Sequence, residues 1–155
     1  MAIQTSLRQV DRSALRVNQA GTITLLLLSF VFNAPWLAGG LALLNLLGAL
    51  NPRLNLFVRL YRHALRPAGL VKPDIVPDNP EPHRFAQGLG VAFVGLGVLA
   101  LVAGQPVLGW ALIWLVVGLA AVNLFLGFCV GCFLYYQLNR RGVPWFRYSQ
   151  VKRSG

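Results

Sequence analysis

Two long uncharged runs divide the chain into apolar and basic blocks. No charged residue occurs between Arg16 and Arg53, or between Arg84 and Arg140. A membrane-spanning helix needs about 20 mostly apolar residues, so each run has room for two spans, the first pair short. The turn sequences NAPW at 33–36 and AGQP at 103–106 mark where each run folds back, because proline is tolerated in the first turn of a helix. We therefore predict four spans, at about 19–34, 36–50, 85–104 and 107–122.

A third segment follows each predicted hairpin. LNLFVRLYRHALR at 54–66 is amphipathic and basic, as expected of a helix that lies in a membrane interface. In the second half, residues 107–136 are uncharged throughout, and one helix of that length would be about 45 Å long against a hydrocarbon core of about 30 Å. Such a run either tilts and protrudes or bends. We favour a bend near Asn123, which opens the segment 123–138.

The two halves resemble one another in sequence. When the second half is laid over the first, Arg84 and Gln87 match Arg16 and Gln19, and the tripeptide NLF at 123–125 matches NLF at 55–57 at the same offset. The predicted fold is all-α and integral to a membrane: two tandem repeats of a helical hairpin, each followed by an interfacial or partly membrane-embedded helix. The predicted boundaries are 1–72 for the first repeat, 73–83 for a proline-rich acidic linker, and 84–155 for the second repeat.

Composition supports a membrane protein rather than a soluble one. Only 12% of the 155 residues are charged, whereas a soluble domain has about a quarter. Arg8 to Arg16 followed by TITLLLLSFVF is also typical of a signal peptide, but the apolar run continues well beyond it, so we predict an uncleaved first span.

The basic residues predict the orientation. All 14 lysines and arginines lie in three blocks, at 8–16, 53–84 and 140–153, and the two short turns carry no charge. By the positive-inside rule both termini are cytoplasmic and the turns face outward. The net charge of +10 favours anionic lipid headgroups of the bilayer. We predict no nucleic-acid partner, because the charge follows the topology rather than a binding face.

The two cysteines, Cys129 and Cys132, lie three residues apart within the apolar segment GFCVGCFLYY. On a helix that restarted near Asn123 they would be neighbours, about two turns from its N-terminus, where the helix dipole does little for a thiolate. They are either small buried residues, a transient disulfide, a persulfide carrier, or half of a metal site. A permanent disulfide is not expected on the reducing cytoplasmic side. A metal would need two more ligands, from His63, His83 or a second subunit, although each histidine also fits a solvated interface residue; we predict no metal and no cofactor.

Two further sets of residues are candidates for binding or packing. Asn123, Gly127 and Gly131 fall on one helical stripe of the small-xxx-small type, which lets another helix approach closely. Polar residues at matching repeat positions often mark transport sites, so the second set either anchors the spans by charge or lines an anion-binding vestibule. That second set is Arg16, Gln19, Arg84 and Gln87.

The sequences PEPHRFAQGLG at 80–90 and GFCVGCFLY at 127–135, together with the double-hairpin layout, resemble a family of small bacterial membrane proteins known as domain of unknown function 4395. The resemblance covers nearly the whole chain and implies a bacterial plasma-membrane location. Members are often encoded near thioredoxin-like proteins and sulfurtransferases, which implies a link with thiol or sulfur chemistry. The resemblance to the family is most specific at Arg84, Phe85, Gln87, Gly127, Cys129, Gly131, Cys132 and Tyr135.

The leading hypothesis is a membrane protein whose Cys129/Cys132 dithiol takes part in thiol redox or sulfur transfer with a cytosolic thioredoxin-like or sulfurtransferase partner. One alternative is a non-catalytic subunit or scaffold in a homo- or hetero-oligomer. Another is a small transporter of a sulfur anion. The sequence contains no Ser-His-Asp set, paired carboxylates or phosphate loop, so hydrolase and pump chemistry are not expected, and whether the chain is an enzyme stays open.

Overall fold

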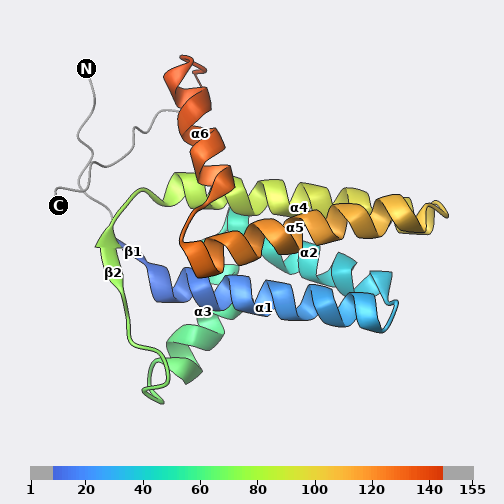
Figure 1. Ribbon diagram of the computed structural model, residues 1–155. Coiled ribbons are helices and arrows are strands. Elements are labelled where there is room, and N and C mark those ends of the chain that lie inside the picture. Colours follow the sequence, from blue (N-terminus) through green and yellow to red (C-terminus); the bar gives the residue numbers. More distant parts are fainter. Residues whose placement is uncertain (1–8, 145–155) are drawn as a thin grey trace.

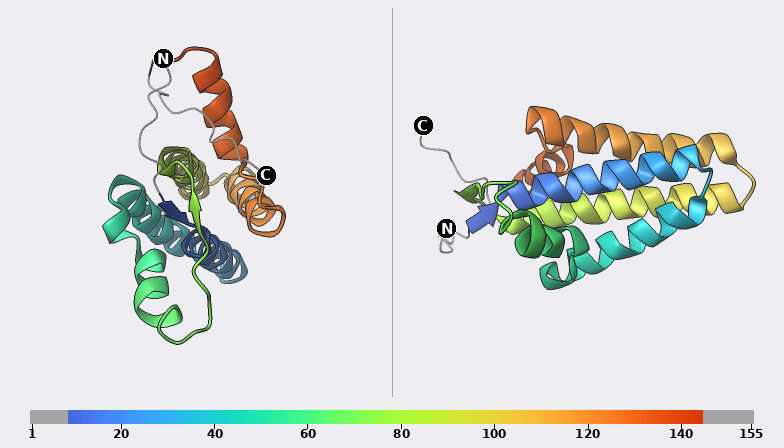
Figure 2. Two further views of the ribbon diagram at one scale, coloured as in Figure 1. Left: turned by 90° about the vertical axis from the view of Figure 1, so that its left-hand side faces the viewer. Right: turned by 90° about the horizontal axis from the view of Figure 1, so that it is seen from below.

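The protein is an antiparallel bundle of four long helices, seen here in a computed structural model that describes residues 9–144 (Figure 1). Each helix packs against two of the others, so the bundle closes in the order α1, α2, α4, α5 (Figure 2). Its core is small and aliphatic, formed by Leu26, Ala38, Leu41, Ala42, Val94, Ile113, Val116 and Val117. The four long helices are α1 (Arg12–Val31), α2 (Pro35–Leu50), α4 (Pro80–Val102) and α5 (Pro106–Leu126).

Three of these helices, α1, α4 and α5, are long and apolar enough to cross a membrane; α2, at 16 residues, is shorter. Large apolar side chains cover the outside of the bundle, with Leu99 66% and Val107 84% exposed. In water such a surface would be unfavourable, whereas lipid solvates it. The all-α membrane class predicted from the sequence therefore agrees with the structure.

The helix starts differ from the predicted ones for local reasons. α1 begins at Arg12 rather than near residue 19, because the Asp11 carboxylate caps it by accepting the N–H of Ser13 at 3.0 Å. α4 begins at Pro80 rather than near residue 85, because proline is well suited to the first helical position. Residues predicted as linker or basic segment therefore extend two of the bundle helices at one end.

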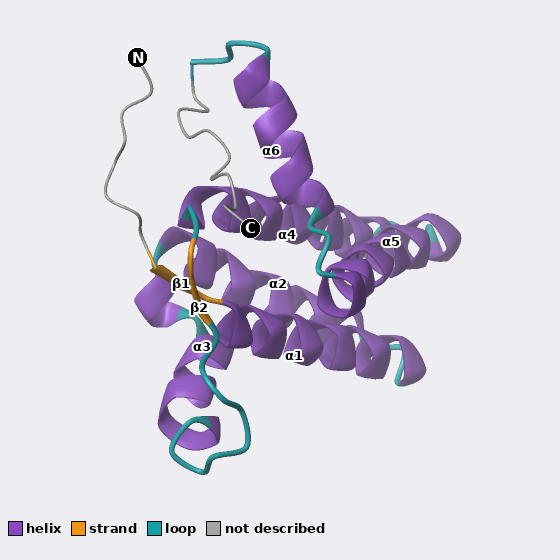
Figure 3. Ribbon diagram, turned by 60° about the vertical axis from the view of Figure 1, so that its left-hand side comes forward, coloured by secondary structure: helices purple, strands orange, loops and turns teal. Residues whose placement is uncertain are grey.

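Short elements gather at that same end. The strands β1 (Gln9–Asp11) and β2 (Ile75–Pro77) pair antiparallel (Figure 3). The chain between α2 and β2 forms a 3₁₀ turn η1 (Pro52–Leu54), a short α3 (Leu56–Leu60) and a π-helical turn η2 (Tyr61–Leu65). The predicted amphipathic helix at 54–66 is thus present in pieces, with Arg59, Arg62, His63 and Arg66 exposed.

The last helix, α6 (Val130–Arg140), leaves the bundle and packs across α4 (Figure 1). The bend before it lies at Gly127, one turn after the predicted Asn123. Asn55 does open α3 in the first half, where α2 ends just before Pro52. No proline lies between residues 107 and 126 of the second half, so α5 continues through Asn123. The third segments of the two halves therefore differ, and the tandem repeat stays a prediction.

Candidate functional site: a cysteine pair at a helix N-terminus

Gly127 creates the local geometry of the cysteine pair. It ends α5 in the left-handed conformation, with φ +66° and its N–H donated to the Asn123 carbonyl at 3.1 Å. This is the usual helix end at which glycine is favoured, because other residues meet a steric penalty there. The sequence predicts that Gly127 continues a helical packing stripe from Asn123. In the structure it does not, because α5 ends just before it. It turns the chain so that a new helix starts three residues later.

Cys129 is the N-cap residue of α6. Its backbone is extended, and its sulfur accepts the N–H of Cys132 at 3.2 Å. The helix is 11 residues long, and its unpaired N–H groups favour negative charge at this position. The prediction that Cys129 lies about two turns inside a helix is therefore wrong. Because Cys129 is the N-cap, the helix dipole acts directly on it.

The two cysteines are joined by a disulfide bond, with their Cα atoms 5.2 Å apart. They are not equally accessible. Cys132 is buried, with 7% of its surface exposed, whereas Cys129 is only partly buried. In the reduced state Cys129 would therefore be the sulfur that an incoming molecule meets first.

Gly131 lets α6 lie directly on α4. A Cβ atom at this position would lie 2.5 Å from the Cβ and 2.8 Å from the Cα of Ala86, which is closer than real contacts allow. The rings of Phe85 and Tyr135 pack edge to face along the same interface, with centroids 5.7 Å apart. Gly131 thus serves a close helix contact within this chain, and that contact brings the first turn of α4 next to the cysteines.

His83, in the first turn of α4, faces the pair. Its Nδ1 atom lies 3.5 Å from the Cys132 sulfur, and its Nε2 atom lies 3.2 Å from an Asp78 carboxylate oxygen. The hydrogen bond to His83 lowers the pKa of the Asp78 carboxyl below its usual value. A carboxylate on Nε2 fixes the proton there in the neutral ring, which leaves Nδ1 as a base directed at sulfur.

An open, cationic vestibule lies in front of the disulfide. It has a volume of about 1560 Å³, and Cys129, Cys132 and His83 line it. Tyr136 also lines it, and burial, with Asp78 nearby, raises the pKa of this phenol to about 12, so it remains a neutral hydroxyl. The cations of the vestibule are Arg12, Arg16 and Arg140.

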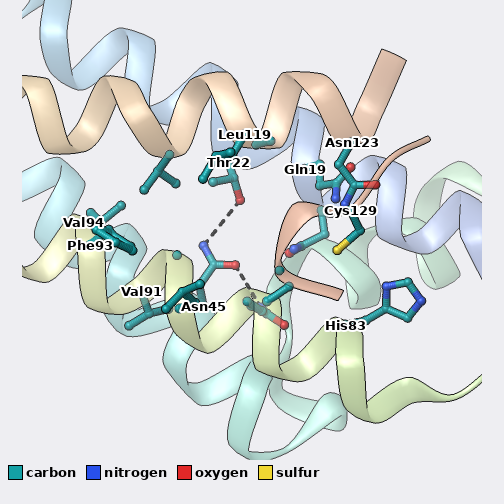
Figure 4. A pocket seen from close by; sticks show the side chains of 18 of the residues that line it. Gln19, Thr22, Asn45, His83, Val91, Phe93, Val94, Leu119, Asn123 and Cys129 are labelled. Carbon is teal, nitrogen blue, oxygen red and sulfur yellow. Dashed lines mark hydrogen bonds between the residues drawn. The ribbon is translucent and has the colours of Figure 1, made fainter. Parts of the chain in front are cut away.

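A smaller inner cavity of about 150 Å³ continues from Cys129 into the bundle (Figure 4). Asn45 is its central polar group: the amide nitrogen donates to the Thr22 hydroxyl at 3.4 Å, and the amide oxygen accepts from Gln87 at 3.0 Å. Amides among apolar helices need such partners, because an unpaired amide is costly to bury. Besides His83 and Cys129, the polar lining is Asn18, Gln19, Thr22, Asn45, Gln87 and Asn123.

The predicted polar residues are only partly brought together. Arg16 and Gln19 line the vestibule, and Gln19 and Gln87 line the inner cavity. Arg84 is not among the described residues that line either space. Its guanidinium donates to the carbonyls of Ala49 at 2.8 Å and Leu50 at 2.9 Å, and so caps the C-terminus of α2.

Sequence reasoning underrated His83 and missed Asp78. The sequence presents His83 as only one possible metal ligand beside His63 and a second subunit, and Asp78 lies in the segment predicted as a linker. Proline at position 80 was the available signal, since proline is favoured at the first helical position and a helix that starts there includes His83 in its first turn. The contact of Asn45 with Thr22 and Gln87 joins three helices and has no counterpart in sequence spacing.

Comparisons with known proteins place the chain in one family. A search of curated proteins and a search of solved structures found no match. One family model matches residues 10–140, which covers both hairpins, the histidine and the cysteine pair. The chain therefore belongs to the family described as domain of unknown function DUF4395.

Proposed function

We propose that this protein is a membrane thiol–disulfide oxidoreductase, with Cys129 as the attacking thiol and Cys132 as the resolving thiol. The observation that carries the proposal is the position of Cys129 at the N-cap of α6, accessible from the vestibule, beside a buried Cys132. A helix N-terminus stabilises the thiolate, which is the form that attacks a disulfide.

The exchange follows from this asymmetry. The Cys129 thiolate attacks one sulfur of a partner disulfide, and the partner's other sulfur leaves as a thiolate. Cys132 then attacks the Cys129 sulfur, with Nδ1 of His83 placed to take its proton. The second partner thiolate leaves, so the partner gains two electrons and two protons while the Cys129–Cys132 disulfide forms. The reverse sequence reduces the pair.

The partner is proposed to be a soluble, cytosolic thioredoxin-like or sulfurtransferase protein. Arginines of the basic segments line the vestibule, and the positive-inside rule favours a cytoplasmic side for that end of the bundle. The resemblance to the family implies that the membrane is a bacterial plasma membrane. Arginines around the vestibule favour a partner with an acidic docking face or an anionic sulfur species.

Trapping tests the proposal directly. In Cys132→Ser this chain cannot resolve a mixed disulfide on Cys129. With added thioredoxin that keeps only its attacking cysteine, supplied as a mixed disulfide with a small aromatic thiol, a covalent complex should therefore accumulate about tenfold or more above wild type. Cys129→Ser and the double serine variant are the matched controls, and neither should form the complex. Equal trapping by both single variants would refute the assigned roles, and trapping by neither would refute the function.

Transport of a small sulfur anion is a second candidate, favoured by the inner cavity that continues from the vestibule. The guanidinium of Arg84 is engaged in hydrogen bonds to carbonyls of α2, so Arg16 and Gln19 would bind the anion instead. Thiosulfate uptake into proteoliposomes that is abolished by Arg16→Ala but retained by Cys129→Ser would favour this reading over thiol exchange.

A further inference from the structure

We propose that the reduced protein binds one thiophilic d¹⁰ metal ion, Zn²⁺ or Cu⁺, through Cys129, Cys132 and His83. The sulfur atoms of the cysteines and a ring nitrogen of His83 all lie within 4.8 Å of one another. The inference rests on the same cysteines as the proposed function, but it assigns a different ligand to them.

The distances suit a single ion. Zinc binds thiolate sulfur at about 2.3 Å and imidazole nitrogen at about 2.1 Å, so the ligand atoms of one tetrahedral ion lie about 3.5 to 4 Å apart. The Cys132 sulfur is 3.5 Å from Nδ1 of His83. Once reduction breaks the disulfide, the two sulfurs repel to a nonbonded separation, which lies in the same range.

The histidine carries the support that metal-binding histidines have. Its other nitrogen, Nε2, is 3.2 Å from the carboxylate of Asp78, which holds the ring in the tautomer with a free Nδ1. The same free Nδ1 that serves as a base in the proposed exchange is the atom that would bind the ion.

Softness and charge select the ion. Two thiolates and an imidazole favour Cu⁺ and Zn²⁺ over harder cations such as Mg²⁺. Two thiolates leave the site neutral with Zn²⁺ and singly negative with Cu⁺. Arg12, Arg16 and Arg140 outnumber Asp78 around the vestibule, so their positive charge is compatible with either net charge of the site. For Zn²⁺, water from the vestibule would supply the fourth ligand, as in zinc sites with three protein ligands.

Binding couples metal to redox state. The reduced pair takes up the ion and releases two thiol protons. When a partner disulfide takes two electrons from the two thiolates, the Cys129–Cys132 disulfide forms, the partner gains two protons from solvent, and the ion is released. The metal-bound and disulfide forms are therefore mutually exclusive.

The test uses the full chain in detergent, reduced and then freed of reductant without oxygen. Zn²⁺ is measured by competition with a chromophoric zinc chelator and Cu⁺ by competition with a chromophoric copper chelator. We expect one equivalent of at least one ion on the reduced protein and none on the disulfide form. Cobalt substitution should give a sulfur-to-metal charge-transfer band.

Variants identify the ligands. His83→Ala and Cys129→Ser should each weaken binding more than tenfold, and Asp78→Asn should weaken it by about 10- to 100-fold through the ring of His83. His63→Ala, at an exposed position on η2, is the matched control and should bind as wild type does. Binding that is equally tight in His83→Ala, or none to the reduced wild type, would overturn the site.

The two proposals fail separately. A reduced wild-type protein that exchanges with thioredoxin but binds neither ion rejects the metal site and leaves the exchange function. One that binds an ion but forms no mixed disulfide in Cys132→Ser rejects the exchange function and leaves the metal site.

Discussion

At the scale of single residues, three polar side chains at or near the cysteine end of the bundle are each held by defined partners. Arg84 bonds two carbonyls of α2, His83 lies between Asp78 and Cys132, and Asn45 links α2 to Thr22 and Gln87. Among apolar helices, a polar group without such partners would be costly. These contacts therefore give Arg84, His83 and Asn45 a structural reason for their positions. Only His83, which lies beside the cysteines, also has a proposed chemical role.

Arg84 separates a structural role from an anion-binding one. Replacing it with methionine, which keeps much of the length, removes two hydrogen bonds from the C-terminus of α2. Because the side chain is exposed, we expect a loss of only about 1 kcal/mol in the free energy of unfolding. Unfolding in mixed detergent and denaturant measures it. A stable Arg84→Met protein that had lost binding of thiosulfate would instead support the anion site.

At the scale of elements, the sequence predicted the helices better than it predicted the ends that build the site. Long apolar runs and Pro35 and Pro106 are local signals, and they placed the four long helices and their tight turns. The restart of the helix at Cys129 depends on the left-handed conformation of Gly127, and one sequence does not distinguish a glycine that ends a helix from one that packs inside it. The cysteines were therefore identified correctly as a pair, while their relation to a helix N-terminus was not.

The contact of α6 with α4 can be tested at Gly131. Alanine there would overlap Ala86, and overpacking of this kind costs about 1 to 3 kcal/mol, so α6 should shift away from α4. We expect Cys132 in reduced Gly131→Ala to react with a maleimide several times faster than in wild type. Gly118→Ala, where a Cβ meets nothing within 4 Å, is the matched control.

A second substitution shows whether the overlap is the cause. An Ala86→Gly background removes the 2.5 Å contact with the Cβ of residue 86 but keeps its Cα 2.8 Å from the added methyl group, so the effect of Gly131→Ala on maleimide reactivity should be clearly reduced but not abolished. An unchanged effect in that background would mean that α6 responds to something other than its contact with Ala86.

At the scale of the whole molecule, the bundle has two chemically different ends. The tight turns at 32–34 and 103–105 lie at one end, whereas α3, the strand pair and α6 lie at the other (Figure 1). Residues of α1, β2 and α6 at that second end line the vestibule. α2 is about 24 Å long at 1.5 Å per residue, which is less than a typical hydrocarbon core of about 30 Å. The membrane is therefore expected to thin around α2, or α2 to stop short of the interface at one end, with the cysteine pair at the basic surface.

This arrangement predicts sidedness that can be measured. In a background with Cys129 and Cys132 replaced by alanine, single cysteines at Asn33 and Gly104 should react with an impermeant maleimide added outside intact cells, because both positions lie in the turns far from the basic segments. A cysteine at Lys72 should react only after the membrane is made permeable, since it lies beside the strand pair at the opposite end. Labelling of position 72 from outside would place the cysteine pair in an oxidising compartment, where its partner would be a secreted thiol protein rather than a cytosolic one.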